Sequence, residues 1–196
     1  MRHFLTQWFQ DRRYRRIGRQ KDNLRQQVSR QRKSLSHEQV LELSEQVMQK
    51  LETLPEFERA QSVMVYYPLR NEVSTLGLIE RWYDKKRILL PVINGSKLDI
   101  RPYEGQENMM VGSYGIMEPT TDLYTGPIDL IVIPGVAFDR SLNRLGRGKG
   151  YYDRFLHHTT RPIVGICYDF QLVEEVPSLS HDHRVTRIVT PTEIVG

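Results

Sequence analysis

Short, continuously apolar segments recur along this chain, and helix-type patterns separate them. The strongest is "IDLIVIP" at residues 128–134, and similar runs occupy 62–68, 87–92 and 162–168. A strand that is apolar on both faces lies in a sheet covered on both sides, and such sheets are mostly parallel. The alternation therefore predicts an α/β fold: a single domain with a mostly parallel sheet flanked by helices on both faces, in a Rossmann-like three-layer sandwich.

The remaining elements have recognisable boundaries. Ser36 followed by Gln39 is a capping box that opens a helix, and Pro55 marks the end of that helix. The alternating run at 97–103 predicts an edge strand, and the run at 187–191 predicts a last strand that closes the sheet. No repeat or linker interrupts this pattern, so the chain beyond the first residues is expected to be one domain.

In open α/β sheets, ligands bind beyond the carboxyl ends of the strands. The site is therefore expected in the loops after Tyr67, Val92, Ile133 and Tyr168. The densest segment nearby is "NRLGRGKGYYDRF" at 143–155, where glycines alternate with arginine and lysine before a predicted helix. Glycine lets backbone N–H groups approach a phosphate closely, and Arg and Lys neutralise its oxygens. The segment predicts a phosphate site, although it matches neither the Walker loop nor the dinucleotide fingerprint.

The net charge is distributed unevenly. Six arginines and one acid give residues 1–20 a net charge of +5, and since the whole chain carries +4, residues 21–196 carry −1. Residues 1–20 are interpreted as a basic amphipathic extension of a domain formed by residues 21–196. A partly ordered helix that packs its aromatic side chains on the body is the preferred interpretation. An arm for a membrane surface or a nucleic acid and a targeting peptide are the alternatives.

Cys167 is the only cysteine, so no disulfide framework exists and a reducing, cytoplasmic location is expected. The apolar residues around it predict a buried structural thiol. The longest strongly apolar run, at 130–138, is too short to cross a bilayer. A body with a charge near zero also argues against nucleic acid as its partner. We expect a monomer with no nucleic-acid and no membrane partner.

The segment "PGVAFDRSLNRLGRGKGYYDRFL", residues 134–156, closely resembles the signature of the 5-formyltetrahydrofolate cyclo-ligase family, also called methenyltetrahydrofolate synthetases. Four further segments are similar to those of the family and occur in the same order: "KDNLR", "YYPLRNEVST", "GSYGIMEP" and "VPSLSHDHRVTRIVT". The resemblance thus extends from about Lys21 to Thr192. It implies an enzyme that uses ATP and Mg²⁺ to convert 5-formyltetrahydrofolate into 5,10-methenyltetrahydrofolate, with release of ADP and phosphate.

The resemblance also implies roles for individual residues. Arg147 and Lys149 would stabilise the transferring phosphoryl group, and Glu72 would orient the folate. The ATP-binding residues would be Lys21, Arg25, Arg144, Leu145, Gly146, Arg147, Gly148, Lys149, Gly150, Tyr151 and Tyr152. The substrate would contact Tyr67, Glu72, Tyr114 and Tyr151, and the magnesium ligands would be Asp153 and Asp182. Lys21 and Arg25 lie one helical turn apart, so both can face one anion.

The implied chemistry is consistent with these residue types. The formyl group is an amide, so its carbon is a weak electrophile and its oxygen is a poor leaving group. Transfer of the γ-phosphoryl group to that oxygen removes both obstacles, and the 10-nitrogen of the folate can then attack the carbon as phosphate departs. Such a reaction needs in-line positioning and neutralised charge more than a protein nucleophile.

Two positions depart from the family pattern. Leu142 stands where the family usually has glycine, which leaves the geometry of the turn open, and Thr186 replaces the second aspartate near the C-terminus. Two alternative functions are retained. One is an ATP-dependent phosphotransferase of the same fold that acts on another anionic small molecule. The other is an RNA- or membrane-binding protein that acts through its arginine-rich first residues.

Overall fold

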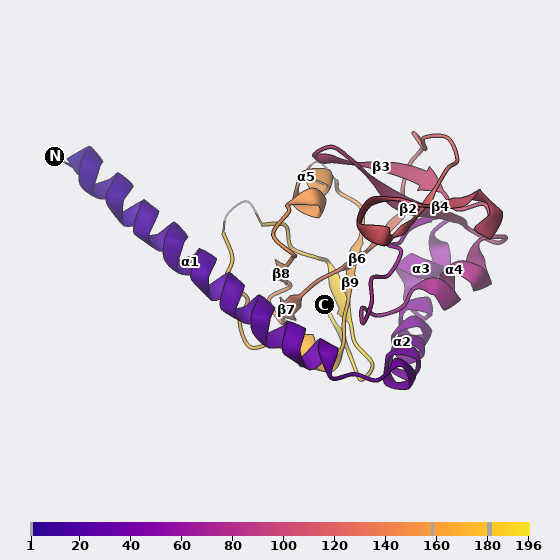
Figure 1. The fold of residues 1–196 in the computed structure, drawn as a ribbon, viewed down its shortest axis with the longest axis horizontal. Coiled ribbons are helices and arrows are strands. Elements are labelled where there is room, and N and C mark those ends of the chain that lie inside the picture. Colours follow the sequence, from indigo (N-terminus) through magenta and orange to yellow (C-terminus); the bar gives the residue numbers. More distant parts are fainter. Residues whose placement is uncertain (1, 158, 180–181) are drawn as a thin grey trace.

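A seven-stranded sheet forms the centre of the computed structural model, which describes residues 2–157, 159–179 and 182–196, and their side chains from Tyr14 onward except that of Tyr114 (Figure 1). The strand order is β12-β11-β9-β6-β1-β2-β3. The strands are β1 (Ser62–Met64), β2 (Arg87–Asn94), β3 (Lys97–Pro102), β6 (Leu130–Pro134), β9 (Ile163–Ile166), β11 (Arg187–Val189) and β12 (Ile194–Val195). The five inner strands are parallel, and the edge strands β3 and β12 are antiparallel to their neighbours. The mostly parallel sheet and the edge position of β3 are confirmed, whereas β12, which was not predicted, pairs outside β11.

The sheet separates two layers of hydrophobic core. In β6, Leu130 and Val132 belong to one layer, and Ile131 and Ile133 belong to the other. This division follows from the two-residue period of a strand. All four side chains are at most 2% exposed. A strand buried on both faces explains why this segment of the sequence is continuously apolar.

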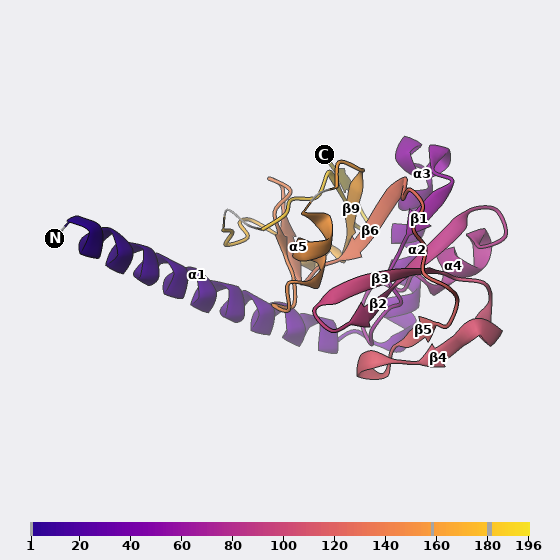
Figure 2. The same cartoon turned by 90° about the horizontal axis from the view of Figure 1, so that it is seen from above.

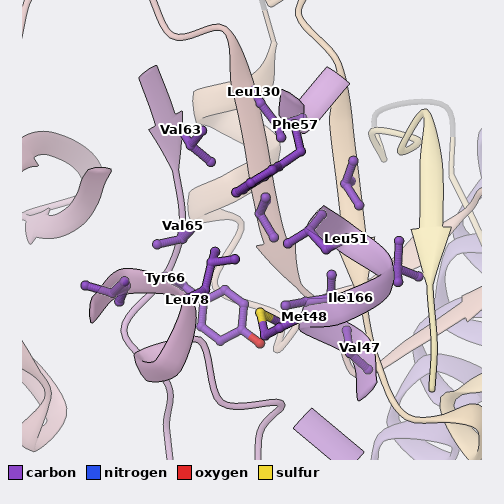
Figure 3. Packing of buried hydrophobic residues seen from close by; sticks show 14 of the residues in the cluster. Val47, Met48, Leu51, Phe57, Val63, Val65, Tyr66, Leu78, Leu130 and Ile166 are labelled. Atoms are coloured by element: carbon purple, nitrogen blue, oxygen red, sulfur yellow. The ribbon is translucent and has the colours of Figure 1, made fainter. Parts of the chain in front are cut away.

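Three helices cover one face of the sheet: α2 (His37–Glu52), α3 (Pro55–Arg59) and α4 (Leu76–Trp82). Their buried side chains, including Met48, Phe57 and Leu78, pack in the first core layer (Figure 3). The predicted capping box is present at the start of α2. The Ser36 hydroxyl accepts a hydrogen bond from the Gln39 N–H (3.1 Å), and the Gln39 side chain accepts one from the Ser36 N–H (2.9 Å).

The opposite face carries α5 (Tyr151–Leu156) and a small second sheet that the periodicity does not predict. This sheet contains β7 (Ala137–Asp139), β8 (Arg144–Leu145) and β10 (Leu172–Val173). Phe138 of β7 lies directly over Gly165 of β9, where a Cβ atom would collide with the aromatic ring. Gly165 therefore permits the close approach of the two sheets. A hairpin of β4 (Met109–Val111) and β5 (Met117–Pro119) packs beside β2.

The N-terminal helix α1 (Arg2–Lys33) is continuous across the expected boundary at residue 20. Its C-terminal part docks through Val28, which is 1% exposed and packs with Val136, Leu145 and Val176. In Figures 1 and 2, the first turns of α1 project away from the body. The aromatic side chains expected to pack on the body precede Tyr14 and lie outside the described side chains. In the described part of the chain, no helix combines the length and hydrophobicity needed to span a membrane.

The carboxylate of Asp129 attaches the start of β6 to the start of β1. It accepts hydrogen bonds of 3.0 Å from the N–H groups of Gln61 and Ser62 and from the Ser62 hydroxyl. Burial alone would raise the pKa of Asp129, but these hydrogen bonds hold the pKa below its usual value. We expect Asp129→Ala to lower the free energy of unfolding by about 2–3 kcal/mol, because two backbone donors lose a charged acceptor.

Urea unfolding at neutral pH measures this difference. Since the pKa of Asp129 is lowered in the folded state, its stabilising contribution is complete above the unfolded pKa of about 3.9 and is lost as the pH falls through the folded value. Asp122→Ala removes an exposed carboxylate from the loop between β5 and β6, which also contains Asp129, and should change the free energy of unfolding by less than about 0.5 kcal/mol. Equal effects of the two substitutions would contradict the role of Asp129.

Candidate active site

Two cavities share one wall, formed by the glycine loop at residues 146–150. The polar cavity has a volume of about 640 Å³, and the apolar cavity has a volume of about 490 Å³. The polar cavity is lined by Lys21, Arg25, Arg144, Leu145, Gly146, Gly148, Lys149, Gly150, Asp153, Arg154, His157 and Asp182. The apolar cavity lies beyond the carboxyl ends of β1, β2 and β6, which is where the strand order predicts a ligand.

The glycine loop connects β8 to α5. Gly148 has φ 91° and Gly150 has φ 69°, which are left-handed conformations that residues with a side chain rarely adopt. Gly150 is also the N-cap of α5. The helix predicted after the loop is present, but it has only six residues, so its dipole contributes little. An anion at this loop would therefore depend mainly on side-chain cations and on the loop's own N–H groups.

Lys21 and Arg25 of α1 line the polar cavity together, in agreement with their spacing of one helical turn. The Arg25 Nε donates a hydrogen bond to the Gly146 carbonyl (3.0 Å), which attaches α1 to the glycine loop. Lys149 and Arg154 add two exposed cations to the same cavity. Cations from α1, the glycine loop and α5 thus converge around one cavity, and they create a positive potential suited to a polyphosphate.

The predicted magnesium ligands, Asp153 and Asp182, both line the polar cavity. Asp182 pairs with Lys21 (2.5 Å), and Asp153 pairs with Arg144 (2.9 Å). Among the described residues, no group of three or more His, Cys, Asp or Glu side chains is placed to hold a metal ion. Mg²⁺ usually takes one or two carboxylates and completes its shell with water and phosphate oxygens. The two aspartates therefore fit a Mg²⁺ ion that is bound together with a nucleotide.

Arg144 lines both cavities and so lies at their junction. Its side chain is 3% exposed, and its guanidinium lies 5.6 Å from the centre of the Tyr152 ring. Within the described part of the chain, its buried Nε has no hydrogen-bond partner. Burying a donor without an acceptor is costly. This donor is therefore the feature of the site that best fits an anionic ligand.

Glu72 is buried beside the apolar cavity, with 7% of its surface exposed. Its Oε1 pairs with the Arg147 guanidinium (2.6 Å) and lies 3.6 Å from that of Arg32. Its Oε2 accepts a hydrogen bond from the Leu69 N–H (3.0 Å), and the Tyr168 hydroxyl donates one to the Glu72 carbonyl (2.9 Å). A carboxylate is rarely buried unless it is paired. Two arginines compensate for the charge at this position.

The predicted substrate-contacting tyrosines do not all have described positions. Tyr67 and Tyr151 both line the apolar cavity. The Arg154 guanidinium lies 5.4 Å from the centre of the Tyr151 ring, so one face of this ring is already covered. The side chain of Tyr114 lies outside the described residues. The structure therefore brings two of the three predicted tyrosines to one cavity.

Two further tyrosines of the apolar cavity, Tyr66 and Tyr152, lie close enough to Glu72 to be affected by its charge. Sequence reasoning assigned Tyr152 to ATP and did not identify Tyr66. Burial, followed by the negative charge of Glu72, raises the pKa of both hydroxyl groups. Both therefore stay protonated at neutral pH, and the Tyr66 hydroxyl donates a hydrogen bond to the Val73 carbonyl (2.7 Å).

Arg147 lies in a different place from most of the other predicted ATP-binding residues. It lines the apolar cavity, where it pairs with Glu72, and it is not among the residues that line the polar cavity. Tyr151 and Tyr152 likewise line only the apolar cavity of the two. Lys149, by contrast, lines both. In this arrangement, Arg147 serves as a counter-charge for Glu72.

Arg32 is a residue of the site that sequence reasoning overlooked. It lies on the helix face already marked by Lys21 and Arg25, and Val28 continues that face between them and Arg32. Spacings of four, three and four residues keep these side chains on one side of a helix. Extending the Lys21–Arg25 pair along α1 would have identified it. Burial lowers the pKa of Arg32, and the nearby Glu72 offsets part of that effect.

The structure accounts for both departures from the family pattern. Leu142 has φ 66°, so the turn keeps the left-handed conformation that suits glycine, at a cost of about 1–2 kcal/mol. Asp139 supports this turn by accepting hydrogen bonds from the N–H groups of Ser141 and Asn143. The Thr186 hydroxyl accepts a hydrogen bond from the Ile163 N–H and donates one to its carbonyl, so this residue holds the start of β9.

Comparison with known proteins agrees with this geometry. The model of the 5-formyltetrahydrofolate cyclo-ligase family matches residues 17–191. A 5-formyltetrahydrofolate cyclo-ligase of Escherichia coli (strain K12) is 34% identical over an alignment of 179 residues, and the match covers 85% of this chain and 98% of the relative. The solved structure of a 5,10-methenyltetrahydrofolate synthetase of Aquifex aeolicus has a TM-score of 0.81 and 36% identity, and covers 89% of this chain and 91% of its own. The solved structure of a 5,10-methenyltetrahydrofolate synthetase of Mycoplasma pneumoniae has a TM-score of 0.70 and 26% identity, and the match covers 87% of this chain and 98% of that chain. This chain therefore belongs to the 5-formyltetrahydrofolate cyclo-ligase family.

Proposed function

We propose that this enzyme cyclises 5-formyltetrahydrofolate to 5,10-methenyltetrahydrofolate at the expense of ATP, with Mg²⁺ as its metal. The observation that carries the proposal is the pair of cavities that share the glycine loop. One has the cations that a polyphosphate needs, and the other has the apolar walls and single buried carboxylate that suit a folate. Arg144 and Lys149 line both cavities, so two substrates bound in them can meet beside these side chains.

The polar cavity would bind the ATP phosphates. Lys21, Arg25 and Lys149 neutralise their charge, and the N–H groups of the glycine loop approach the oxygens. Asp153 and Asp182 would hold Mg²⁺, which supplies further charge neutralisation when it is bound. Each aspartate would then exchange part of its contact with Arg144 or Lys21 for the metal.

The apolar cavity would bind the folate. Its volume of about 490 Å³ lies within the usual range for a small-molecule site. Tyr67 and Tyr151 provide aromatic surface, and Glu72 provides carboxylate oxygens that can accept hydrogen bonds from the N–H groups of the pterin ring. Arg147 occupies one of these oxygens in the present arrangement. We expect the folate to displace Arg147, whose exposed side chain can turn away from Glu72.

The reaction would take place where the cavities meet, beside Arg144 and Lys149. The formyl oxygen attacks the γ-phosphorus, the bond to the ADP oxygen breaks, and the formyl carbon becomes electrophilic. The 10-nitrogen then attacks that carbon and loses its proton, and the carbon–oxygen bond breaks to release phosphate. Arg144 and Lys149 neutralise the transferring group, and Arg147 can join them once it leaves Glu72. The protein supplies positioning and charge rather than a nucleophile.

The proposal also divides the chain into a domain that contains the site and an N-terminal extension. The family match begins at residue 17, and Lys21 is the first residue of α1 that lines the polar cavity. Residues 21–196 would contain the whole site, and residues 1–20 would form an extension outside it. The expected monomer and the expected lack of nucleic-acid and membrane partners stay predictions.

The assay for the proposed function mixes the protein with MgATP and 5-formyltetrahydrofolate and follows the near-ultraviolet absorbance of the methenyl product. We expect the signal to require both ATP and Mg²⁺, so that EDTA abolishes it and added Mg²⁺ restores it. A chain that lacks residues 1–16 should retain the rate. Folded protein that produces no ATP-dependent signal would refute the proposal, and phosphorylation of a different small molecule would support a phosphotransferase instead.

A further inference from the structure

Glu72 has two cationic partners that differ in exposure. The Arg32 side chain is 10% exposed, and the Arg147 side chain is 53% exposed. Arg32 belongs to α1, whereas Arg147 stands between two glycines of the loop. An exposed side chain on a glycine loop changes its rotamer readily, and a buried one on a packed helix does not. Arg147 is thus the exchangeable partner of Glu72, and Arg32 is the fixed one.

Arg32 is fixed by reciprocal hydrogen bonds as well as by burial. Its Nε donates to the Asn71 carbonyl (2.9 Å), and the Asn71 side-chain amide donates to the Arg32 carbonyl (3.0 Å). Asn71 has φ 62°, a left-handed conformation that asparagine tolerates better than most residues. These bonds clamp the segment after β1 to the last turn of α1. They place Glu72, the next residue along the chain, beside the Arg32 guanidinium.

We propose that Arg32 is a positioning residue that holds the Glu72 carboxylate in place for the folate when Arg147 turns toward the phosphoryl group. This inference rests on the proposed function. If Arg147 were the only partner, its departure would leave a buried carboxylate without a counter-charge, which is strongly disfavoured. Arg32 is not among the residues that line either cavity. It therefore acts on the substrate through Glu72.

The first test compares Arg32→Gln with Arg30→Gln. Both substitutions remove one positive charge from the last turns of α1, but Arg30 is exposed. We expect Arg32→Gln to lower kcat/KM for 5-formyltetrahydrofolate about tenfold or more, mainly through KM, with the KM for MgATP changed by less than about twofold. Arg30→Gln should leave both KM values unchanged. Equal kcat/KM values for 5-formyltetrahydrofolate in the two variants would overturn the inference.

A double-variant cycle separates positioning from a merely structural role. In a Glu72→Gln background, Arg32→Gln should change kcat/KM by less than about twofold, because the interaction through which it acts is already gone. An equal loss in both backgrounds would overturn the inference, since it would show that Arg32 acts through the Asn71 clamp alone. Thermal unfolding checks that each variant is folded.

Arg32→Lys keeps the inference testable if Arg32→Gln folds poorly. It loses the hydrogen bond to the Asn71 carbonyl but retains the charge beside Glu72, so its kcat/KM should stay within about threefold of the wild type, and a folded Arg32→Lys variant that loses tenfold or more would overturn the inference. A wild type that turns over, with no coupling between Arg32→Gln and Glu72→Gln, overturns this inference alone. A wild type that shows no ATP-dependent turnover overturns the proposed function and this inference with it.

Discussion

Lys149→Ala should lower kcat for the proposed ATP-dependent ring closure by about a hundred- to a thousand-fold, the usual cost of removing one group that stabilises developing charge. Lys149 is exposed and lines both cavities, so its ammonium can follow the phosphoryl group from one substrate to the other. Within the described residues its ammonium makes no ion pair. Its removal should therefore leave the fold intact.

Steady-state kinetics with both substrates varied will measure this effect, together with thermal unfolding to compare stabilities. Lys149→Arg restores the charge and should recover part of the rate. Lys97→Ala removes an exposed lysine that lines neither cavity and should leave kcat unchanged. Unaltered turnover in Lys149→Ala would remove this residue from the proposed mechanism.

Glu72→Gln should lower kcat/KM for 5-formyltetrahydrofolate by about a hundred-fold or more and leave the affinity for MgATP unchanged. Glutamine has nearly the same shape and can still accept the hydrogen bond from the Leu69 N–H, but it lacks the charge that faces the Arg32 and Arg147 guanidinium groups. An amide is also a weaker acceptor than a carboxylate. We further expect a loss of about 3 kcal/mol in the free energy of unfolding, because the buried Arg32 is left without its partner.

Calorimetric titration with each substrate separates the two affinities, and urea unfolding measures the change in stability. Glu104→Gln is the matched control, since this exposed carboxylate lines neither cavity. A Glu72→Gln variant that is less stable but keeps its folate affinity would show that Glu72 is structural. An equal loss of MgATP affinity would show that Glu72 does not act specifically on the folate, which would contradict its proposed role.

The predictable parts of the fold are those with a strong local pattern. β6 is buried on both faces, and its apolar run is short, rich in β-branched residues and followed by glycine, which together favour a strand over a buried helix. The capping box of Ser36 and Gln39 has the same local character. The strands β7, β8 and β10 have two or three residues each and form through pairing with one another. Elements this short carry no periodicity of their own.

The N-terminal helix α1 also shows that a local sequence pattern does not determine every element boundary or contact. Its charge distribution indicates a boundary near residue 20, but the backbone continues through it as one helix. Charge patterns report which residues face solvent and do not determine where a helix ends. The docking of α1 depends on Val28, whose partners Val136, Leu145 and Val176 lie more than a hundred positions further along the chain.

The sequence by itself determined the parallel sheet, the loop at residues 143–155 in which glycines alternate with cations, and the pairing of Lys21 with Arg25 on one helix face. Each of these depends on neighbours within a few positions, whose geometry the backbone imposes directly. Only the tertiary structure decided that Arg147 meets Glu72 across 75 positions and that Arg32 lies on the other side of the same charge. It also decided that the glycine loop divides the site into two cavities. Contacts between distant charges depend on how whole elements pack, and no local pattern in the sequence encodes that packing.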